Sequence, residues 1–301
     1  MRRGPSQLWH TKVANPYLDE GHAPERCPCA TPLLRCAVRS VGVNQHDLDR
    51  ARRLVDESAK VVVLTGAGVS TASGIPDFRG PEGVWTKDPA AERLSDIDAF
   101  TSSSEIREQA WGRLLSRRGV DVQPNPAHFA LVAFERTGKL TALVTQNIDG
   151  LHVKAGSDPQ LVIEVHGNSR TTRCLQCGDE LPTATVLERV AAGERDPYCH
   201  AVVENVECGG LLKTAVVSFG QPLPAGDFAR AEYFAKTCDL LICIGSTLSV
   251  RPVAGLVPKA LDRGAKLIII NAEPTPFDDQ ADVVVRGDIP VVLSELLGAD
   301  S

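Results

Sequence analysis

An apolar strand that leads directly into a glycine-rich turn constrains the fold more than any other part of this chain. Residues 61–65, VVVLT, are all apolar or β-branched, which predicts a buried strand of a parallel sheet. Gly66 and Gly68 allow a sharp turn and a close approach of the backbone to a pyrophosphate, and a following helix N-terminus would offer N–H groups to the phosphates. The stretch predicts the start of a dinucleotide site.

The residues after the turn differ from the dehydrogenase fingerprint G-x-G-x-x-G. Thr71 stands where the third glycine belongs, and the helix and ribose-binding acid expected about twenty residues on are replaced by a loop. Residues 74–85 are GIPDFRGPEGVW, in which two prolines and three glycines exclude a regular helix. A solvated surface loop is the alternative, but Asp77, Phe78, Arg79 and the terminal Trp85 favour a loop that closes over a cofactor.

Three long motifs follow one another along the chain: GAGVSTASGIPDFRG at 66–80, TQNIDGLH at 145–152 and His-Gly-Asn at 166–168. In order and spacing they resemble the signatures of the sirtuin family of NAD-dependent protein lysine deacylases. The resemblance extends from about Leu48 to about Leu297. It implies NAD as cofactor and deacylation of protein lysines as the activity.

Apolar runs of strand length alternate with segments of helical spacing in the rest of the chain. Strands are expected at 61–65, 140–145, 161–165, 240–244, 267–271 and 281–285, and helices at 47–59, 126–137 and 253–263. Helices between apolar strands predict an α/β fold with a doubly wound parallel sheet. We expect a Rossmann-like NAD-binding domain over 46–166 and 212–298, with a smaller zinc-binding module inserted at 167–211.

Four cysteines carry the prediction of zinc. Cys174 and Cys177 have C-x-x-C spacing, and Cys199 and Cys208 follow about twenty residues later. Four thiolates suit one tetrahedral zinc ion with no open position, which predicts a structural site. Two disulfides are the alternative, but no export signal is recognisable, so a reducing compartment is favoured. The second pair is wider than the C-x-x-C of many sirtuins, and His200 is kept as a substitute ligand.

Composition and charge limit the partners. The first 45 residues mix proline, glycine, charges and three cysteines without periodicity, so we expect a mostly disordered extension. A net charge of −6 over 301 residues argues against a general grip on nucleic acid. No apolar run reaches the roughly 18 residues that a membrane span needs. We therefore expect a cytoplasmic protein with no nucleic-acid or membrane partner, and the oligomeric state stays open.

The resemblance assigns the chemistry to residues that follow the predicted strands. A lone histidine ending a strand is more often structural than catalytic, but by resemblance His166 is the general base that deprotonates a ribose hydroxyl, which then attacks the imidate formed with the acyl oxygen. An ordinary pKa of about 6.5 suits this role. Asn147 is expected to orient the ribose or a water, and Asp149 to engage the nicotinamide carboxamide.

The resemblance also implies a cofactor site drawn from several segments. CIGSTLSV at 243–250 offers small residues to phosphate or ribose, INAEP at 270–274 offers an acid to the ribose, and a segment near residue 288 is expected to cover adenine. The expected cofactor-binding residues are Gly66, Ala67, Gly68, Ser70, Thr71, Asp77, Phe78, Arg79, Trp85, Gln146, Asn147, Asp149, His166, Gly245, Ser246, Thr247, Asn271, Glu273 and Ile289.

The substrate segment follows from the same comparison. VVSFGQPLP at 216–224 resembles the segment to which an acyl-lysine peptide adds as a strand, so Val217, Phe219 and Gly220 are expected to line the lysine tunnel. Gln221 stands where many sirtuins have an acid. The Tyr-x-x-Arg pair of sirtuins that remove succinyl or malonyl groups is absent around 111–117, which favours neutral acyl groups. Motif hints to the subclass disagree, so the subclass stays open.

Three functions remain. The leading one is a deacylase of the transferase class that takes acyl-lysine proteins or peptides and yields nicotinamide and O-acyl-ADP-ribose. The second is a protein mono-ADP-ribosyltransferase that uses the same His166. The third is a non-catalytic NAD-binding module, and the presence of His166, Asn147 and Asp149 counts against it.

Overall fold

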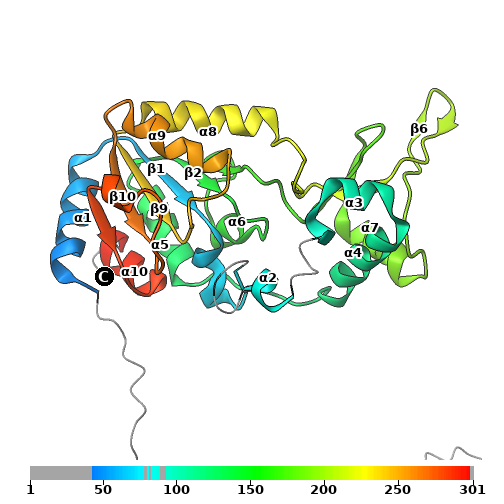
Figure 1. Ribbon diagram of the computed structural model, residues 1–301, viewed down its shortest axis with the longest axis horizontal. Coiled ribbons are helices and arrows are strands. Elements are labelled where there is room, and N and C mark those ends of the chain that lie inside the picture. Colours follow the sequence, from blue (N-terminus) through cyan, green and yellow to red (C-terminus); the bar gives the residue numbers. More distant parts are fainter. Residues whose placement is uncertain (1–42, 78–79, 81–82, 89–92, 299–301) are drawn as a thin grey trace, which may run out of the picture. The chain divides into compact units, whose positions relative to one another are not determined.

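A six-stranded parallel sheet forms the centre of the fold in the computed structural model, which describes residues 43–77, 80, 83–88 and 93–298. Its strand order is β11-β10-β9-β1-β2-β3. The strands β1, β2, β9 and β10 are labelled in Figure 1. The strands are β1 (Val61–Thr65), β2 (Leu140–Thr145), β3 (Val162–Glu164), β9 (Leu240–Ile244), β10 (Lys266–Ile270) and β11 (Val283–Val285). The chain adds β2 and β3 on one side of β1 and the later strands on the other, so the winding direction reverses between β1 and β9.

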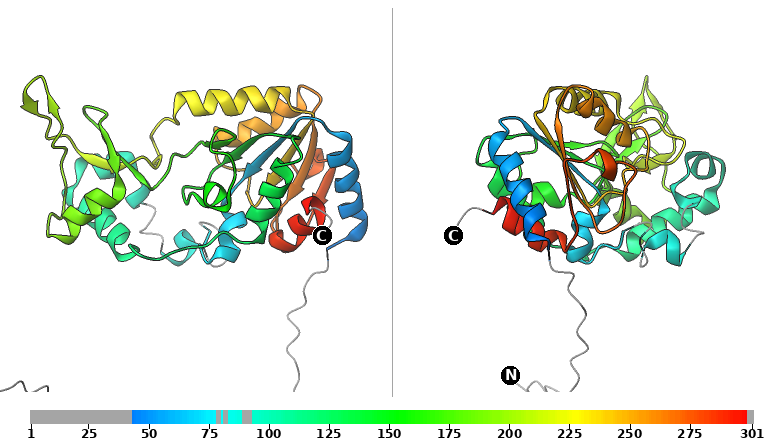
Figure 2. Two further views of the ribbon diagram at one scale, coloured as in Figure 1. Left: turned by 180° about the vertical axis from the view of Figure 1, so that it is seen from behind. Right: turned by 60° about the vertical axis from the view of Figure 1, so that its left-hand side comes forward.

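Helices cover both faces of this sheet (Figure 2). On one face lie α1 (Gln45–Glu57), α5 (Pro126–Glu135) and α10 (Ile289–Leu297), and on the other lie α8 (Ala225–Thr237) and α9 (Leu256–Leu261). Alternate residues of β1 serve the two layers, because Val61 and Val63 pack into the first and Val62 and Leu64 into the second. The predicted doubly wound α/β fold is confirmed.

Capping residues explain where two of these helices begin. The Asn125 side chain accepts the backbone N–H of Ala127, and Pro126 occupies the first position of α5, where no N–H is needed. The Asp288 side chain caps α10 in the same way through Val291 N–H. The predicted helices at 47–59 and 126–137 are present with ends shifted by a few residues, and 253–263 divides into η3 (Val253–Gly255) and α9.

The segment after β1 departs from the expected pattern. A 3₁₀ helix, η1 (Ala67–Ser73), follows the glycine turn, and Gly74 ends it with a left-handed backbone. A short helix, α2 (Val84–Lys87), begins inside the predicted loop 74–85, so that loop is shorter than expected. Phe78 and Arg79 lie outside the described residues, as does the side chain of Trp85. Residues 1–42 of the predicted extension lie outside them too, and α1 already begins at Gln45.

A smaller region carries the cysteines. Its strands β4 (Thr171–Cys174), β5 (Glu180–Pro182) and β8 (Leu212–Thr214) form an antiparallel sheet, and β6 (Val202–Val203) and β7 (Val206–Glu207) form a hairpin. β8 extends this sheet beyond the predicted module boundary at residue 211. The remaining helices are α3 (Ile97–Ser102), α4 (Ser104–Ser116), α6 (Leu151–Ala155), α7 (Thr183–Ala191) and η4 (Asp278–Gln280).

A small core joins α4 to this region. Trp111 of α4 is 1% exposed and packs with Cys174, Val186 and Leu212. The cysteine region therefore shares its core with a helix that comes from before β2 in the sequence. Among the described helices, none has the length and apolar character that a membrane span requires.

Candidate functional site

Glycines and polar side chains gather at the carboxyl ends of five adjacent strands. Residues 66–71 follow β1, 146–149 follow β2, His166 follows β3, 245–247 follow β9, and Asn271 follows β10. Parallel strands end at the same edge, so these segments meet there. In open α/β sheets ligands bind at this edge, next to the point where the winding reverses.

Three glycines bring the turns after β1 and β9 into backbone contact. Gly68 N donates to Gly245 O over 2.9 Å, and Gly66 N donates to Ile244 O over 2.9 Å. A Cβ on Gly68 would lie 2.7 Å from Gly245 Cα, and one on Gly66 would lie 2.7 Å from Gly245 O. Gly245 itself has φ +62°, which favours glycine. The edge of the sheet at the reversal point is therefore formed by bare backbone, with no side chain on these glycines to keep a phosphate away.

Side chains connect the strand ends on either side of this backbone contact. Gln146 Nε2 donates to Ser246 Oγ over 2.8 Å, which links β2 to β9 across β1. Thr247 is exposed, and its hydroxyl pairs with Ser249 Oγ at 2.8 Å. Asn271 Nδ2 donates to Glu273 O over 2.8 Å, and the Glu273 residue is exposed. Two residues that can bind a ribose, Thr247 through its hydroxyl group and Glu273 through its carboxylate, are therefore exposed at this edge.

A shared hydroxyl holds two of the predicted catalytic side chains. Ser70 Oγ donates to Asp149 Oδ2 over 2.8 Å and accepts Asn147 Nδ2 over 3.1 Å. Asp149 Oδ1 accepts the backbone N–H of Leu151 at 2.9 Å, so both carboxylate oxygens are bonded. Ser70 and Asn147 are buried. Ser70 of η1 therefore holds the side chains of both Asn147 and Asp149, and the backbone of Leu151 at the start of α6 also holds Asp149.

His166 is held in one tautomer. Its Nδ1 lies 3.1 Å from the carbonyl oxygen of Gln146. A carbonyl oxygen only accepts, so Nδ1 carries the proton and Nε2 of the neutral ring is left with a lone pair. Burial lowers the pKa of His166 below its ordinary value of 6.5, and the bond to Gln146 offsets part of that shift. His166 is therefore a neutral base at physiological pH.

The predicted substrate segment begins next to this base. Val217 N donates to His166 O over 2.9 Å. Farther along, Phe219 N donates to Ser95 O over 2.7 Å and Phe219 O accepts Ile97 N over 3.1 Å. Gly220 has φ +80°, a backbone conformation that glycine adopts without strain. The structure thus brings Val217 beside His166, whereas Phe219 and Gly220 lie against the start of α3.

Several expected cofactor residues have structural partners of their own. Asp77 Oδ1 accepts Gly80 N over 2.9 Å within the loop after η1. Thr71 is exposed, and its hydroxyl donates to Gly68 O over 3.0 Å. Ile289 is 8% exposed and packs in the core with Val69 of η1, so its side chain faces the interior.

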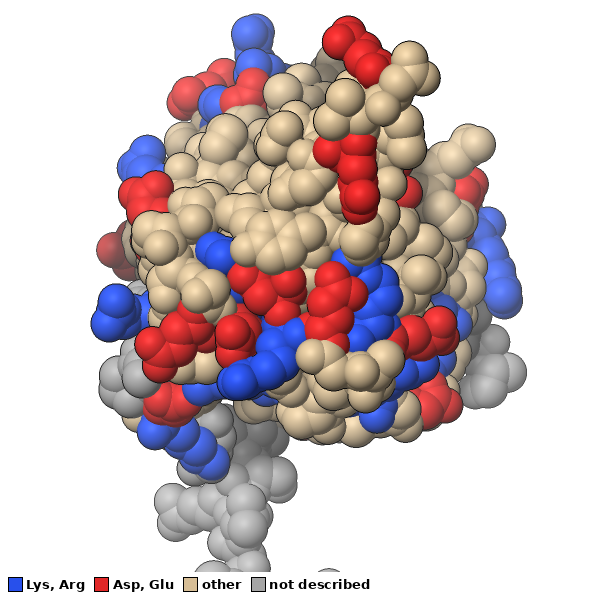
Figure 3. Space-filling model, turned by 90° about the vertical axis from the view of Figure 1, so that its right-hand side faces the viewer, with Lys and Arg blue, Asp and Glu red and all other residues tan. Residues whose placement is uncertain are grey.

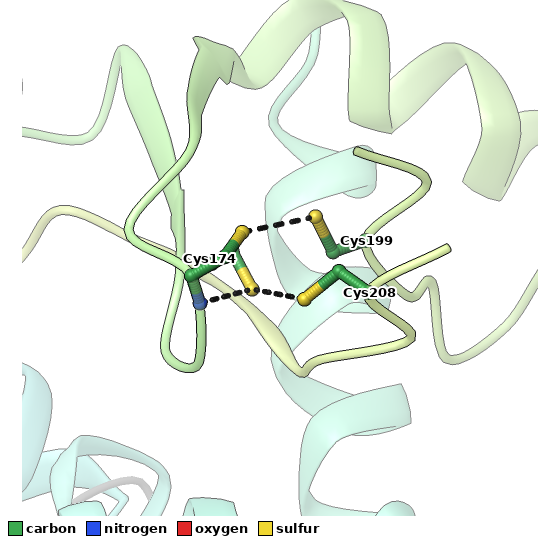
Figure 4. A group of neighbouring side chains, drawn as sticks. Cys174, Cys199 and Cys208 are labelled. Carbon is green, nitrogen blue, oxygen red and sulfur yellow. Dashed lines mark hydrogen bonds between the residues drawn. The ribbon is translucent and has the colours of Figure 1, made fainter. Parts of the chain in front are cut away.

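The four cysteines form one compact group. Figure 4 shows three of them, Cys174, Cys199 and Cys208, pointing toward one another. The Sγ atoms of all four lie within 4.8 Å of one another, and the pairs Cys174–Cys208 and Cys177–Cys199 are each 3.7 Å apart. A zinc–sulfur distance of about 2.3 Å gives a tetrahedron with edges of about 3.8 Å. The donor set therefore fits one structural zinc ion.

The hairpin β6–β7 explains the wide spacing of the second pair. It lies between Cys199 and Cys208, and its turn residues Glu204 and Asn205 both have positive φ. The hairpin returns the chain so that both cysteines reach the group. His200 pairs with Glu207 on the hairpin, so it is not needed as a ligand.

Sequence reasoning missed a buried lysine beside the substrate segment. Lys213 is 5% exposed, and its Nζ donates to the carbonyl oxygens of Thr214 and Val216. Burial lowers the pKa of Lys213 to about 8. The available signal was a single lysine in a mostly apolar run, LLKTAVV at 211–217.

The contact of Asn125 with η1 was also missed. The Asn125 side-chain amide donates to Val69 O and to Ser73 Oγ, each over 2.9 Å, and so holds η1 from the far side. The sequence marks Asn125 as a helix cap through the following proline, but nothing local reveals its contact with η1.

Comparisons with known proteins agree with this geometry. Residues 66–252 match the Sir2 family. NAD-dependent protein deacetylase 2 of Streptomyces coelicolor is 44% identical over 237 residues, which are 79% of this chain and 96% of that protein. A solved Sir2 variant with a deacetylated p53 peptide and 3′-O-acetyl ADP ribose is 34% identical, with a TM-score of 0.73 over 83% of this chain and 96% of that one. A Sir2 complex with a p53 peptide and NAD⁺ is also 34% identical, with a TM-score of 0.70 over 81% and 94%.

Proposed function

Since this chain belongs to the Sir2 family, we propose that it is an NAD-dependent protein lysine deacylase, with deacetylation as its main reaction. The products are nicotinamide, the free lysine and O-acyl-ADP-ribose. The observation that carries this proposal is the neutral His166, whose Nε2 is available as a base and whose backbone carbonyl accepts the N–H of Val217 in the substrate segment. NAD-dependent deacetylases that are similar over most of this chain support the same activity.

The strand-end site fits NAD in its backbone and in its side chains. The turns at Gly66, Gly68 and Gly245 suit the pyrophosphate, and Asn271 and Glu273 suit the adenosine ribose. Bound NAD supplies a glycosidic bond to nicotinamide that can be exchanged for a bond to the acyl oxygen. Phe78, Arg79 and Trp85 stay proposed contacts on the basis of their sequence motif alone.

Proton transfer falls to His166. Its protonated Nδ1 is held by Gln146 O, so Nε2 can take one proton from a ribose hydroxyl and return it later. Asn147 and Asp149 take the positioning roles, toward the ribose or a water and toward the nicotinamide carboxamide. Ser70 fixes both side chains, which keeps them in place before the substrates arrive.

The acylated peptide is proposed to add along residues 217–220. Val217 connects this segment to His166, and Lys213 fixes the carbonyl of Val216 just before it. Neutral acyl groups are favoured, since the Tyr-x-x-Arg pair is absent from 111–117, at the end of α4. On the face that carries the cysteine region, acidic and basic side chains are intermixed (Figure 3).

Product analysis by mass spectrometry tests the proposal. Wild-type protein, NAD and an acetyl-lysine peptide should give deacetylated peptide and O-acetyl-ADP-ribose. His166→Ala should lower kcat by about 10² to 10⁴, the usual contribution of a general base. His46→Ala, which replaces an exposed histidine of α1, should match the wild type. Transfer of ADP-ribose to protein in place of deacetylation would indicate the transferase, and unchanged NAD with acyl peptides of every length would refute both.

The pH profile gives a second readout. Burial lowers the pKa of His166 below its ordinary value of 6.5. As the pH decreases, kcat/KM should therefore reach half of its maximum at a pH below 6.5, where His166 takes up a proton.

A further inference from the structure

Two buried histidines lie beneath the strand-end site and take no part in the chemistry proposed above. His128 of α5 is fully buried and His152 of α6 is 2% exposed. Their ring centroids are 4.9 Å apart, with the rings tilted by 54°. Imidazole nitrogens in a protein interior destabilise the fold unless they are hydrogen-bonded. We therefore expect a hydrogen-bond partner for each of the four ring nitrogens of His128 and His152.

The hydrogen bond at the start of α5 sets the tautomer of His128. The backbone N–H of Asn125 donates to His128 Nδ1 over 3.3 Å. Burial lowers the pKa of His128, so its ring is neutral and carries one proton. Because Nδ1 accepts, that proton lies on Nε2.

The hydroxyl of Thr65 sets the tautomer of His152. Thr65 Oγ1 donates its proton to Thr145 Oγ1 over 2.9 Å, so it can only accept from His152 Nε2, which lies 3.0 Å away. Burial lowers the pKa of His152 to about 3, so this ring is neutral as well. With its proton on Nε2, Nδ1 of His152 is an acceptor.

The two remaining nitrogens are complementary. His128 Nε2 and His152 Nδ1 are buried and have no hydrogen-bond partner among the described residues. The first is a donor and the second an acceptor, on rings in contact. We propose that one buried water joins His128 Nε2–H to His152 Nδ1, and that this histidine pair positions Asn147 and η1 for the deacylation proposed above.

The proposed link completes a chain of bonds between two cofactor segments. On one side, Asn147 N donates to Thr145 Oγ1 over 3.1 Å, and Thr145 connects through Thr65 to His152. On the other side, His128 fixes Asn125, whose amide holds Val69 and Ser73 of η1. A fully bonded network in a low-dielectric interior is rigid, whereas one missing partner leaves a buried group unpaired. The pair would therefore hold the loop of Asn147 and the helix of Ser70 at a fixed separation.

Two substitutions remove only the bridge. In His128→Asn the side-chain oxygen can still accept Asn125 N–H, but the Nε2–H donor is gone. In His152→Gln the amide can still donate to Thr65, but the Nδ1 acceptor is gone. We would measure kcat and KM for the acetyl peptide and the affinity for NAD in both variants, in the double variant and in the exposed-site control His46→Gln. The ¹⁵N spectrum of the wild-type protein would report both tautomers.

We expect Nε2–H tautomers for both rings, and a loss of kcat of about tenfold in each single variant with KM for the peptide unchanged. The loss of kcat in the double variant should be no larger than the loss in the less active single variant, because both changes break the same link. An Nδ1–H tautomer in either ring, independent losses that multiply, or a lower Tm with unchanged kcat would each overturn the inference. If the wild-type protein fails to consume NAD, the proposed function is wrong. The inference is then decided by the two tautomers and by the NAD affinities of the wild type, the two single variants and the double variant.

Discussion

At the scale of single residues, the backbone contact between Gly68 and Gly245 is the least tolerant point of the site. A Cβ on Gly68 would meet Gly245 Cα at 2.7 Å, and neither backbone can move without displacing β1 or β9. We expect Gly68→Ala to lower the free energy of unfolding by about 1–3 kcal/mol and to weaken NAD binding. Urea denaturation and NAD titration would measure both effects.

Gly112→Ala is the matched control for this substitution. Gly112 is an exposed residue of α4, and a Cβ added there would meet no neighbouring atom within 4 Å. Alanine should therefore raise helix stability at this position by about 1 kcal/mol. Equal effects of the two substitutions would contradict the close-packing explanation.

The buried histidine His152 makes stability depend on pH. Its pKa in the folded protein is lowered to about 3, against about 6.5 in the unfolded chain. Above pH 6.5 both states are neutral, and below it the unfolded chain takes up the proton first. The free energy of unfolding should therefore fall by about 1.4 kcal/mol per pH unit as the pH decreases from 6.5 toward 3. His128 adds in the same direction, with the charge of Asp149 offsetting part of its shift.

Urea denaturation of the wild type and His152→Gln between about pH 7.5 and about pH 4.5 would check this dependence. The variant should lose less stability over that range. Parallel curves for the two proteins would show that His152 is not the group that titrates.

The residue scale also shows what the sequence could reveal about the site. The roles of Asn147 and His166 were predicted from the family resemblance of their motifs, and the structure places both residues just after strands that end at one edge of the sheet. Lys213 and the pair His128–His152 were not, since their partners are set by contacts between segments that are distant in sequence. Local patterns carry no information about such contacts.

At the scale of secondary structure, we expect the cysteine region to depend on a bound zinc ion more than on its core. Its buried side chains are few, and the four cysteines hold the β4–β5 turn to the hairpin β6–β7. We expect one zinc per chain, and we expect Cys208→Ser to lose the metal and to expose the region to proteases. Cys238→Ser, which replaces a buried cysteine in the core between the six-stranded sheet and helices α8 and α9, should keep its zinc. Metal analysis and limited proteolysis would measure this, and full zinc content in Cys208→Ser would remove that residue from the ligand set.

Strands were easier to predict than the segments between them. Val61–Thr65, Leu140–Thr145 and Leu240–Ile244 are observed as expected, because strands buried on both faces are apolar or β-branched along their length. The segment after β1 folds as η1, and α2 begins within the predicted loop. Asn125 and the turn of Gly245 both hold η1, so tertiary contacts decide its form.

At the scale of the whole described fold, one buried ion pair joins α4 to the cysteine region. Arg107 and Asp196 are 2.8 Å apart, and their side chains are only 7% and 12% exposed. Arg107 also donates to Phe100 O and Thr101 O, which ties α3 to the same point. The bond to Asp196 raises the pKa of Arg107, so its charge is permanent. The pair therefore connects the segment before β2 to the inserted region.

Removing one partner should be worse than removing both. Asp196→Leu leaves a buried guanidinium without its counter-charge, and we expect it to lower the free energy of unfolding by about 3 kcal/mol. Arg107→Met should have a similar effect through the unpaired carboxylate. The double variant Arg107→Met/Asp196→Leu should recover much of the loss, since apolar side chains can fill the same space. Urea denaturation of the four proteins gives the coupling energy, and additive losses would mean that the two side chains stabilise the fold independently of each other.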